Sequence, residues 1–96
     1  MSELGQAHCR RVTICNQRGL HARASAKFVG MVAGFPEGTT VRVVREGNEA
    51  AGGSILGLMM LGAAKGDEIE IVTGGPAGAE ALEKLCALVE DRFGEE

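Results

Sequence analysis

Aromatic residues are scarce in this chain of 96 residues, which has three Phe and neither Trp nor Tyr. So few rings cannot stack a series of nucleic-acid bases, and a net charge of -3 provides no broad basic surface to follow a phosphate backbone. We therefore expect no nucleic-acid binding. The core must instead be built from aliphatic side chains, which let helices pack closely on a sheet.

Cysteine is also sparse, since Cys9, Cys15 and Cys86 form an odd set with no CxxC spacing. His8 with Cys9 and Cys15 could be read as metal ligands, but no fourth ligand stands at a recognisable spacing. Neighbours on a strand also point to opposite faces. We expect reduced thiols that behave as small hydrophobes, no disulfide framework, no metal site and no cofactor.

Long apolar runs are absent as well. Residues 1–11 are polar and mixed in charge, unlike a secretion signal, and no later stretch is long enough to span a bilayer. These absences predict a cytoplasmic protein without membrane insertion. A chain of this length can bury one modest core, so we expect a single domain over residues 1–96 with flexible ends at 1–9 and 94–96.

Hydrophobic periodicity predicts the order of helices and strands. Alternating or β-branched segments predict strands over 10–16, 39–45, 49–51 and 67–73. Apolar residues at three- and four-residue steps predict helices over 22–33 and 77–93. The order β-α-β-β-α-β-α, completed by a short helix near residue 55, predicts an α+β fold in which three helices cover one face of a four-stranded sheet.

The short helix over 55–61 is the most ambiguous element, because a brief all-apolar run fits a buried strand as well as a buried helix. Two glycines before Ser54 and Gly62 after the run favour the helix, with Ser54 as its N-cap. The segment is more apolar than one buried face requires. Its side chains are either core or part of an exposed docking surface.

His21 is the strongest candidate for chemistry. It lies in the run GLHAR at 19–23, where a glycine loop ends and a helix is predicted to begin. A helix N-terminus has unpaired N–H donors and a partial positive charge, and Arg23 can hold phosphate oxygens with two donors. An unmodified imidazole, with a pKa of about 6.5, offers a neutral nucleophilic nitrogen near pH 7. The alternative is a polar surface histidine or a simple cap.

No general base is apparent beside this histidine. No Asp, Glu or second His stands close to His21 in the sequence, and the chain has no GxxxxGK[ST] loop for nucleotide phosphates. We therefore expect a phosphoryl carrier and not an enzyme. A small α+β hydrolase of the acylphosphatase type is the less favoured alternative.

Two motifs resemble a known family. The run GLHAR followed by AKFV at 26–29 resembles the active-site signature of HPr, the histidine-containing phosphocarrier of the bacterial phosphoenolpyruvate-dependent sugar phosphotransferase system. The run SILGLMMLG at 54–62 with AKG at 64–66 resembles the family's regulatory-serine helix and the turn after it. The resemblance covers about residues 11–89. It implies an open-faced β-sandwich with a four-stranded antiparallel sheet and three helices.

The resemblance also implies roles and partners. Enzyme I, charged by phosphoenolpyruvate, would pass its phosphoryl group to Nδ1 of His21, with help from Arg23, and an enzyme IIA domain would accept it. In lineages that have it, an HPr kinase/phosphorylase would modify Ser54. A carrier that visits several partners is best served as a monomer. The candidate docking residues are Ala22, Ala26, Leu56 and Met59.

Ala24 departs from the family pattern, because many members carry proline just after the arginine. Proline would pre-set the first helical turn, whereas alanine is a good helix former, so the fold is expected to survive. The departure bears on partner preference. It leaves open a mainly regulatory role in the nitrogen-related phosphotransferase system, through phosphorylation-dependent partner binding instead of sugar uptake.

Overall fold

The computed structural model describes residues 7–95 of the chain. The strands in this range are β1 (Ala7–Thr13), β2 (Thr40–Arg45), β3 (Asn48–Ala51) and β4 (Glu68–Gly74). The α-helices are α1 (Ala22–Ala33), α2 (Ile55–Met60) and α3 (Gly78–Glu90), and a short 3-10 turn, η1 (Arg92–Gly94), follows α3. The order of elements is the predicted one.

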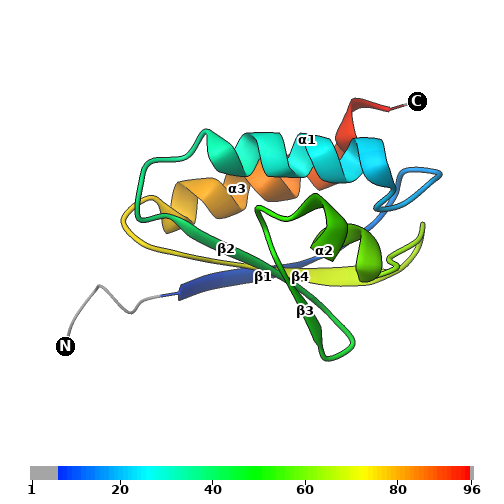
Figure 1. The fold of residues 1–96 in the computed structure, drawn as a ribbon, viewed down its shortest axis with the longest axis horizontal. Helices are drawn as coiled ribbons and strands as arrows, with labels where there is room; N and C mark the ends of the chain where they lie inside the picture. The colour runs from blue at the N-terminus through cyan, green and yellow to red at the C-terminus, as the bar shows by residue number, and fades with distance from the viewer. Residues whose placement is uncertain (1–6, 96) are drawn as a thin grey trace.

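The strands form one antiparallel sheet in the order β1-β4-β2-β3. β4 pairs with β1 along its whole length, from Ala7 opposite Gly74 to Thr13 opposite Glu68. Figure 1 shows α1 and α3 side by side above the sheet, with the short α2 beside them. This confirms the predicted open-faced α+β sandwich.

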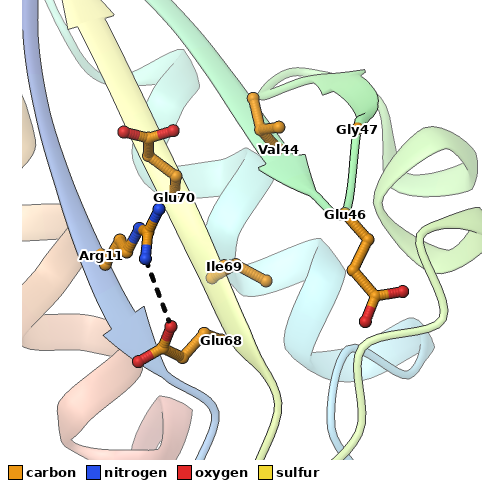
Figure 2. A pocket seen from close by; sticks show the side chains of 7 residues that line it. All are labelled: Arg11, Val44, Glu46, Gly47, Glu68, Ile69 and Glu70. Atoms are coloured by element: carbon orange, nitrogen blue, oxygen red, sulfur yellow. Dashed lines mark ion pairs between the residues drawn. The ribbon is translucent and has the colours of Figure 1, made fainter.

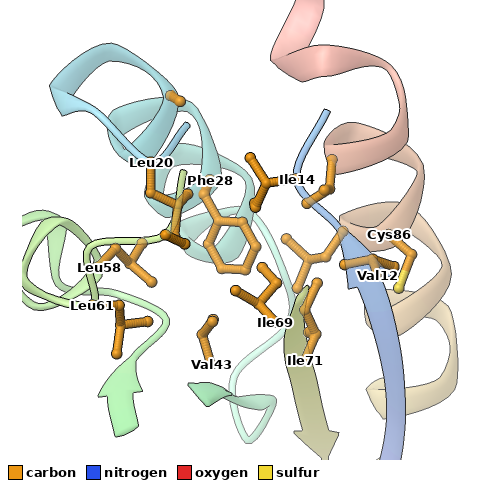
Figure 3. Close-up of a cluster of buried hydrophobic side chains, with 14 of the residues drawn as sticks. Val12, Ile14, Leu20, Phe28, Val43, Leu58, Leu61, Ile69, Ile71 and Cys86 are labelled. Atoms are coloured by element: carbon orange, nitrogen blue, oxygen red, sulfur yellow. The ribbon is translucent and has the colours of Figure 1, made fainter. Parts of the chain in front are cut away.

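The core lies between the helices and one face of the sheet. Alternate strand residues point into it, as the period of two requires, and Ile69 and Ile71 are buried as predicted. Phe28 of α1 packs over them (Figure 3). The opposite face of the sheet carries charge, including an ion pair of 3.9 Å between Arg11 and Glu68. Such one-sided burial is typical of an antiparallel sheet with one solvated face.

The first helix begins and ends where the sequence predicted, but the first strand does not. The strand was predicted over 10–16, whereas β1 covers Ala7–Thr13. It begins earlier because β4 continues to Gly74 and offers pairing as far as Ala7. It ends earlier because Ile14 leaves the ladder: its N–H donates to Asp67 O, and its carbonyl accepts from Gly66 N, both at 2.8 Å.

The predicted flexible ends overlap hydrogen-bonded residues. Residues 7–9 belong to β1, and at the other end Glu95 N–H donates to Arg92 O at 2.9 Å. Residues 1–6 and 96 of the predicted ends lie outside the described residues.

The last helix ends at Glu90 and not at the predicted residue 93. Beyond it Arg92, Phe93 and Gly94 have φ values of 57°, 56° and 74°, which a right-handed helix cannot contain. Phe93 is fully buried, as its apolar character requires, but it reaches the core from η1 instead of from the face of a helix. This left-handed turn carries the chain back toward α1.

The helices are short. Among residues 7–95, none has the length and apolar character needed to cross a bilayer. The three cysteines are free thiols, of which Cys9 is exposed, Cys15 half-buried and Cys86 buried. Burial raises the pKa of the Cys86 thiol, which favours its neutral form.

Candidate functional site

His21 is the N-cap of α1. Its backbone is extended, and its Nδ1 accepts a hydrogen bond from the Arg23 N–H at 3.3 Å. Its carbonyl accepts the first helical bond, from Ser25 N–H at 2.9 Å. The imidazole therefore takes the place that a Ser, Asp or Asn side chain usually fills at a helix N-terminus. The imidazole lies at the positive end of α1, as the sequence predicted, with Nδ1 turned toward the first backbone N–H groups of the helix.

The loop before His21 is held against the loop after α2. Leu20 N–H donates to Ala63 O at 3.0 Å. Gly19 has a φ of +64°, and a Cβ there would lie 2.3 Å from Ala63 O. Only glycine tolerates both the conformation and the close approach. The histidine loop and the α2 segment, which the sequence marked separately, are therefore parts of one region.

A carboxylate also contacts the imidazole. Nε2 of His21 lies 2.8 Å from Oε2 of Glu95, and the two side chains are only 15% and 19% exposed. The other carboxylate oxygen, Oε1, accepts a hydrogen bond from Asn16 Nδ2 at 3.1 Å. Asn16 is buried and also donates to Gly19 O at 2.9 Å. The same amide group thus contacts both Glu95 and the loop that leads to His21.

The charge of Glu95 is favoured by its surroundings. Burial acts to raise the pKa of the carboxyl, but hydrogen bonds from His21 and Asn16 outweigh it. The positive charges of Lys27 and of His21 when protonated act in the same direction. The net effect lowers the pKa of Glu95, so the group is ionised at neutral pH.

Sequence reasoning missed Glu95, Asn16 and Lys27. It found no carboxylate close to His21, and the structure corrects that conclusion: Glu95 is 74 positions away in the chain but in direct contact. One signal was available in Phe93, because a large apolar residue near the predicted flexible end must find a place in the core and fix its neighbours. Lys27 supports that turn, since its Nζ donates to Phe93 O at 2.7 Å.

The remaining candidates on α1 are mostly exposed. Arg23 contacts the imidazole only through its backbone N–H, and its exposed side chain makes no ion pair within residues 7–95. Ala22 and Ala26 are also exposed, whereas Ala24 is fully buried. The guanidinium is therefore available to an incoming anion.

Ser54 is the N-cap of α2, as predicted. Its Oγ accepts a hydrogen bond from Gly57 N–H at 2.9 Å, and the residue is half-buried. A Cβ at position 57 would lie 3.0 Å from this oxygen, so glycine suits a tight cap.

The large apolar residues of α2 divide between core and surface. Leu58 is fully buried, whereas Leu56 is 67% and Met60 76% exposed. Ile55 and Met59 are exposed as well. We call these four exposed residues the α2 patch. The predicted docking residues Leu56 and Met59 are therefore on the surface and not in the core, and α2 packs beside α1.

A separate hollow of about 410 Å³ lies away from these residues (Figure 2). The lining residues carry three carboxylates and one guanidinium. They are Arg11, Val44, Glu46, Gly47, Glu68, Ile69 and Glu70. This charge balance does not suit a phosphate group, and the hollow shares no residue with the His21 region. Across residues 7–95, no cluster of three or more His, Cys, Asp or Glu could hold a metal ion.

Comparisons with known proteins give a consistent result. The family model described as the PTS HPr component phosphorylation site matches residues 8–91, a range that ends before Glu95. The chain is 43% identical to phosphocarrier protein HPr of Cupriavidus necator over 86 residues, covering 90% of this chain and 94% of that protein. It is 40% identical to phosphocarrier protein NPr of Shewanella violacea over 86 residues, covering 90% and 92%. A crystal structure of HPr from Thermoanaerobacter tengcongensis is similar with a TM-score of 0.86 at 32% identity, covering 93% of this chain and 98% of that chain.

Proposed function

The chain belongs to the HPr family of phosphocarrier proteins of the phosphotransferase system, and we propose that it receives a phosphoryl group on His21 from phosphorylated enzyme I. An enzyme IIA domain then accepts the group. The observation that carries this proposal is the position of Nδ1 at the N-terminus of α1, two residues before Arg23, whose exposed side chain makes no ion pair within residues 7–95.

The geometry supports holding a phosphoryl group without trapping it. Backbone N–H groups at a helix N-terminus and the guanidinium of Arg23 favour negative charge, each helix-end interaction contributing about 0.3–1 kcal/mol at an exposed site. Much tighter binding of the bound group would raise the barrier to its onward transfer. The chain then acts as a carrier and not as an enzyme, in the cytoplasm and as a monomer. Light scattering would show a mass near 10.0 kDa for the monomer.

Docking of the partners is assigned to the α2 patch together with Ala22 and Ala26. The exposure of these side chains and the packing of α2 beside α1 support this assignment, because flexible Met side chains adapt to different partner surfaces. Leu56→Ser should raise the KM of enzyme I for this protein with little change in stability, since Leu56 is largely exposed. An unchanged KM would remove Leu56 from the docking surface.

Ser54 is proposed as a regulatory phosphorylation site for an HPr kinase/phosphorylase, in a cell that has one. The half-buried Ser54 directly precedes the α2 patch in the chain, and a phosphate there would add about -1.5 to -2 charge units. Such a charge would weaken docking without unfolding the protein. Incubation with the kinase and ATP should label the natural chain and not Ser54→Ala, and continued labelling of that variant would exclude Ser54.

A mainly regulatory role in the nitrogen-related system is the alternative. The similarity to an NPr protein beside that to an HPr protein leaves it open, and the alanine at position 24 supports it. Initial rates of phosphorylation by the two kinds of enzyme I, of the sugar and the nitrogen-related systems, would decide between them. The faster donor identifies the system that the protein serves.

The direct test of the carrier function is phosphorylation by enzyme I and labelled phosphoenolpyruvate. We expect one acid-labile, base-stable phosphoryl group on the natural chain and none on His21→Ala. Ser54→Ala serves as the control and should be labelled like the natural chain. Full labelling of His21→Ala would overturn the proposal.

A further inference from the structure

We propose that Glu95 is a positioning residue for phosphoryl transfer, which holds the proton of the His21 imidazole on Nε2 and keeps the Nδ1 lone pair available for attack. This inference rests on the carrier function proposed above. It assigns a role to the turn after α3, a part of the chain that the sequence motifs did not mark.

The contacts of the imidazole define where its proton lies. A neutral imidazole has one N–H and one acceptor nitrogen. The Glu95 carboxylate, 2.8 Å from Nε2, can only accept, and the backbone N–H of Arg23, 3.3 Å from Nδ1, can only donate. Both contacts are satisfied by the Nε2–H tautomer alone. The nitrogen that carries the lone pair is therefore Nδ1, at the N-terminus of α1, and this lone pair exchanges the Arg23 N–H for phosphorus when it attacks.

The carboxylate is itself held in place. Asn16 donates to the oxygen that does not face the imidazole, so each oxygen of Glu95 has its own partner. Because Asn16 is buried and also binds Gly19 O, the carboxylate and the loop before His21 share one anchor. A carboxylate with two fixed partners orients the ring as well as its proton.

The turn that carries Glu95 is built from the core outward. Arg92 and Phe93 adopt left-handed backbone conformations, which are unfavourable for residues that have a Cβ. The fully buried Phe93 ring and the hydrogen bond from Lys27 to its carbonyl hold the turn in this conformation. Since Lys27 belongs to α1, the helix that His21 caps also helps to fix the position of Glu95, the residue that contacts the imidazole.

The proposed step needs no additional reactant. The Nδ1 lone pair forms a bond to phosphorus while the bond between phosphorus and the donor's leaving atom breaks, its electron pair remaining on the donor. The ring keeps its Nε2 proton and so gains one positive charge, which lies beside the negative Glu95. When the acceptor attacks phosphorus, the N–P electron pair returns to Nδ1 and the ring is neutral again. The carboxylate of a Ser-His-Asp triad supports its imidazole in the same way.

The first test reads the tautomer directly on unphosphorylated protein. The ¹⁵N chemical shifts of both imidazole nitrogens would be measured over a pH series, and the tautomer would be read where the shifts no longer change on the alkaline side. We expect the Nε2–H form in the natural chain and a shift toward a mixture of tautomers in Glu95→Gln and Glu95→Ala. Glu90→Gln is the matched control, because it makes the same change of charge at an exposed residue of α3, and it should keep the natural tautomer.

The second test measures the rate of phosphoryl transfer from phosphorylated enzyme I by rapid quench. Loss of a hydrogen bond to a charged group predicts a fall of about tenfold in the maximal rate for Glu95→Gln. The concentration of protein at half-maximal rate should change little, because Glu95 is outside the docking surface. Glu90→Gln should transfer at the natural rate.

The outcomes separate this inference from the carrier function. An unchanged tautomer or an unchanged transfer rate in folded Glu95 variants would overturn the role of Glu95 and leave the carrier function intact. Full labelling of His21→Ala would instead overturn the carrier function and this inference with it. Glu95→Gln keeps the size of the side chain and an oxygen for Asn16, so its fold should be retained, and the Phe93 and Lys27 resonances report whether it is.

Discussion

The N-termini of α1 and α2 are built alike at the cap and differently around it. At each, a side chain that we propose to be phosphorylated accepts a backbone N–H of its own helix: His21 from Arg23, and Ser54 from Gly57. The Ser54 cap is complete within three residues. The His21 ring has a second contact, with Glu95, 74 positions away.

This difference shows that the two sites depend on the fold to different degrees. Ser54 needs only its short helix and a glycine at position 57. The surroundings of His21 depend on contacts among three segments, which are the loop with Asn16 and Gly19, the start of α1, and the turn after α3. Changes in distant parts of the core should therefore alter the surroundings of His21 and leave those of Ser54 unchanged.

Truncation of Phe93 should have the largest effect on this comparison. Phe93→Ala removes a fully buried ring, and we expect a loss of about 3–5 kcal/mol in the free energy of unfolding, measured with urea. The imidazole signals of His21 should shift, while the Gly57 amide signal stays in place. Phe93→Leu fills more of the space, so we expect a smaller loss of unfolding free energy and a smaller shift of the His21 imidazole signals. Equal shifts at His21 and Gly57 would show that the two sites are not independent.

Gly19→Ala should have the next largest effect. The positive φ and the approach of Ala63 O to within 2.3 Å of a Cβ predict a loss of about 2–4 kcal/mol in the free energy of unfolding. Phosphorylation by enzyme I should slow as well, because the loop before His21 must move. Gly53→Ala is the control: a Cβ there meets nothing within 4 Å, so a change of no more than about 0.5 kcal/mol is expected. Equal stability of the two variants would contradict the tight packing of the loop.

Ser54→Ala should have a smaller and strictly local effect. Loss of the cap predicts a decrease of about 1 kcal/mol in the free energy of unfolding and faster hydrogen exchange at the Gly57 amide. Ser54→Asp keeps an acceptor at the cap and should restore most of the stability. A changed His21 tautomer in Ser54→Ala would break the proposed contrast.

The pH dependence conferred by Glu95 should be the smallest effect. The pKa of Glu95 is lower in the folded protein than in the unfolded chain, where it is about 4.3. The ionised carboxylate therefore stabilises the fold above about pH 4.3, and this contribution is lost as the pH falls through the pKa of the folded state. The stability advantage of the natural chain over Glu95→Gln should therefore be constant above about pH 5 and shrink as the pH falls below about 4.3. Glu90→Gln provides the baseline. An advantage that stays constant over this range would contradict the favoured ionisation of Glu95.

The elements of the fold were largely predictable because their signals are local. The spacing of apolar residues predicted α1 to the residue, and Ser54 with its flanking glycines predicted the start of α2. The predicted end of α3 at residue 93 was wrong, because the residues from Glu90 to Phe93 continue a helical pattern in the sequence. In the structure the helix ends at Glu90, and Phe93 is buried from a left-handed turn. Tertiary packing overrode the local preference there.

Sequence patterns sufficed for the order of strands and helices, for the place of His21 at the start of a helix, for Ser54 as a helix cap and for the resemblance to HPr, since each depends on neighbours within a few residues. The contact between Glu95 and His21 arose only in the folded structure. A glutamate near the end of a polar segment looks the same in the sequence whether it faces water or an imidazole. Burial of Phe93, the Lys27 hydrogen bond and the Asn16 amide decide between these alternatives, and they come together only when α1 and α3 pack on the same sheet.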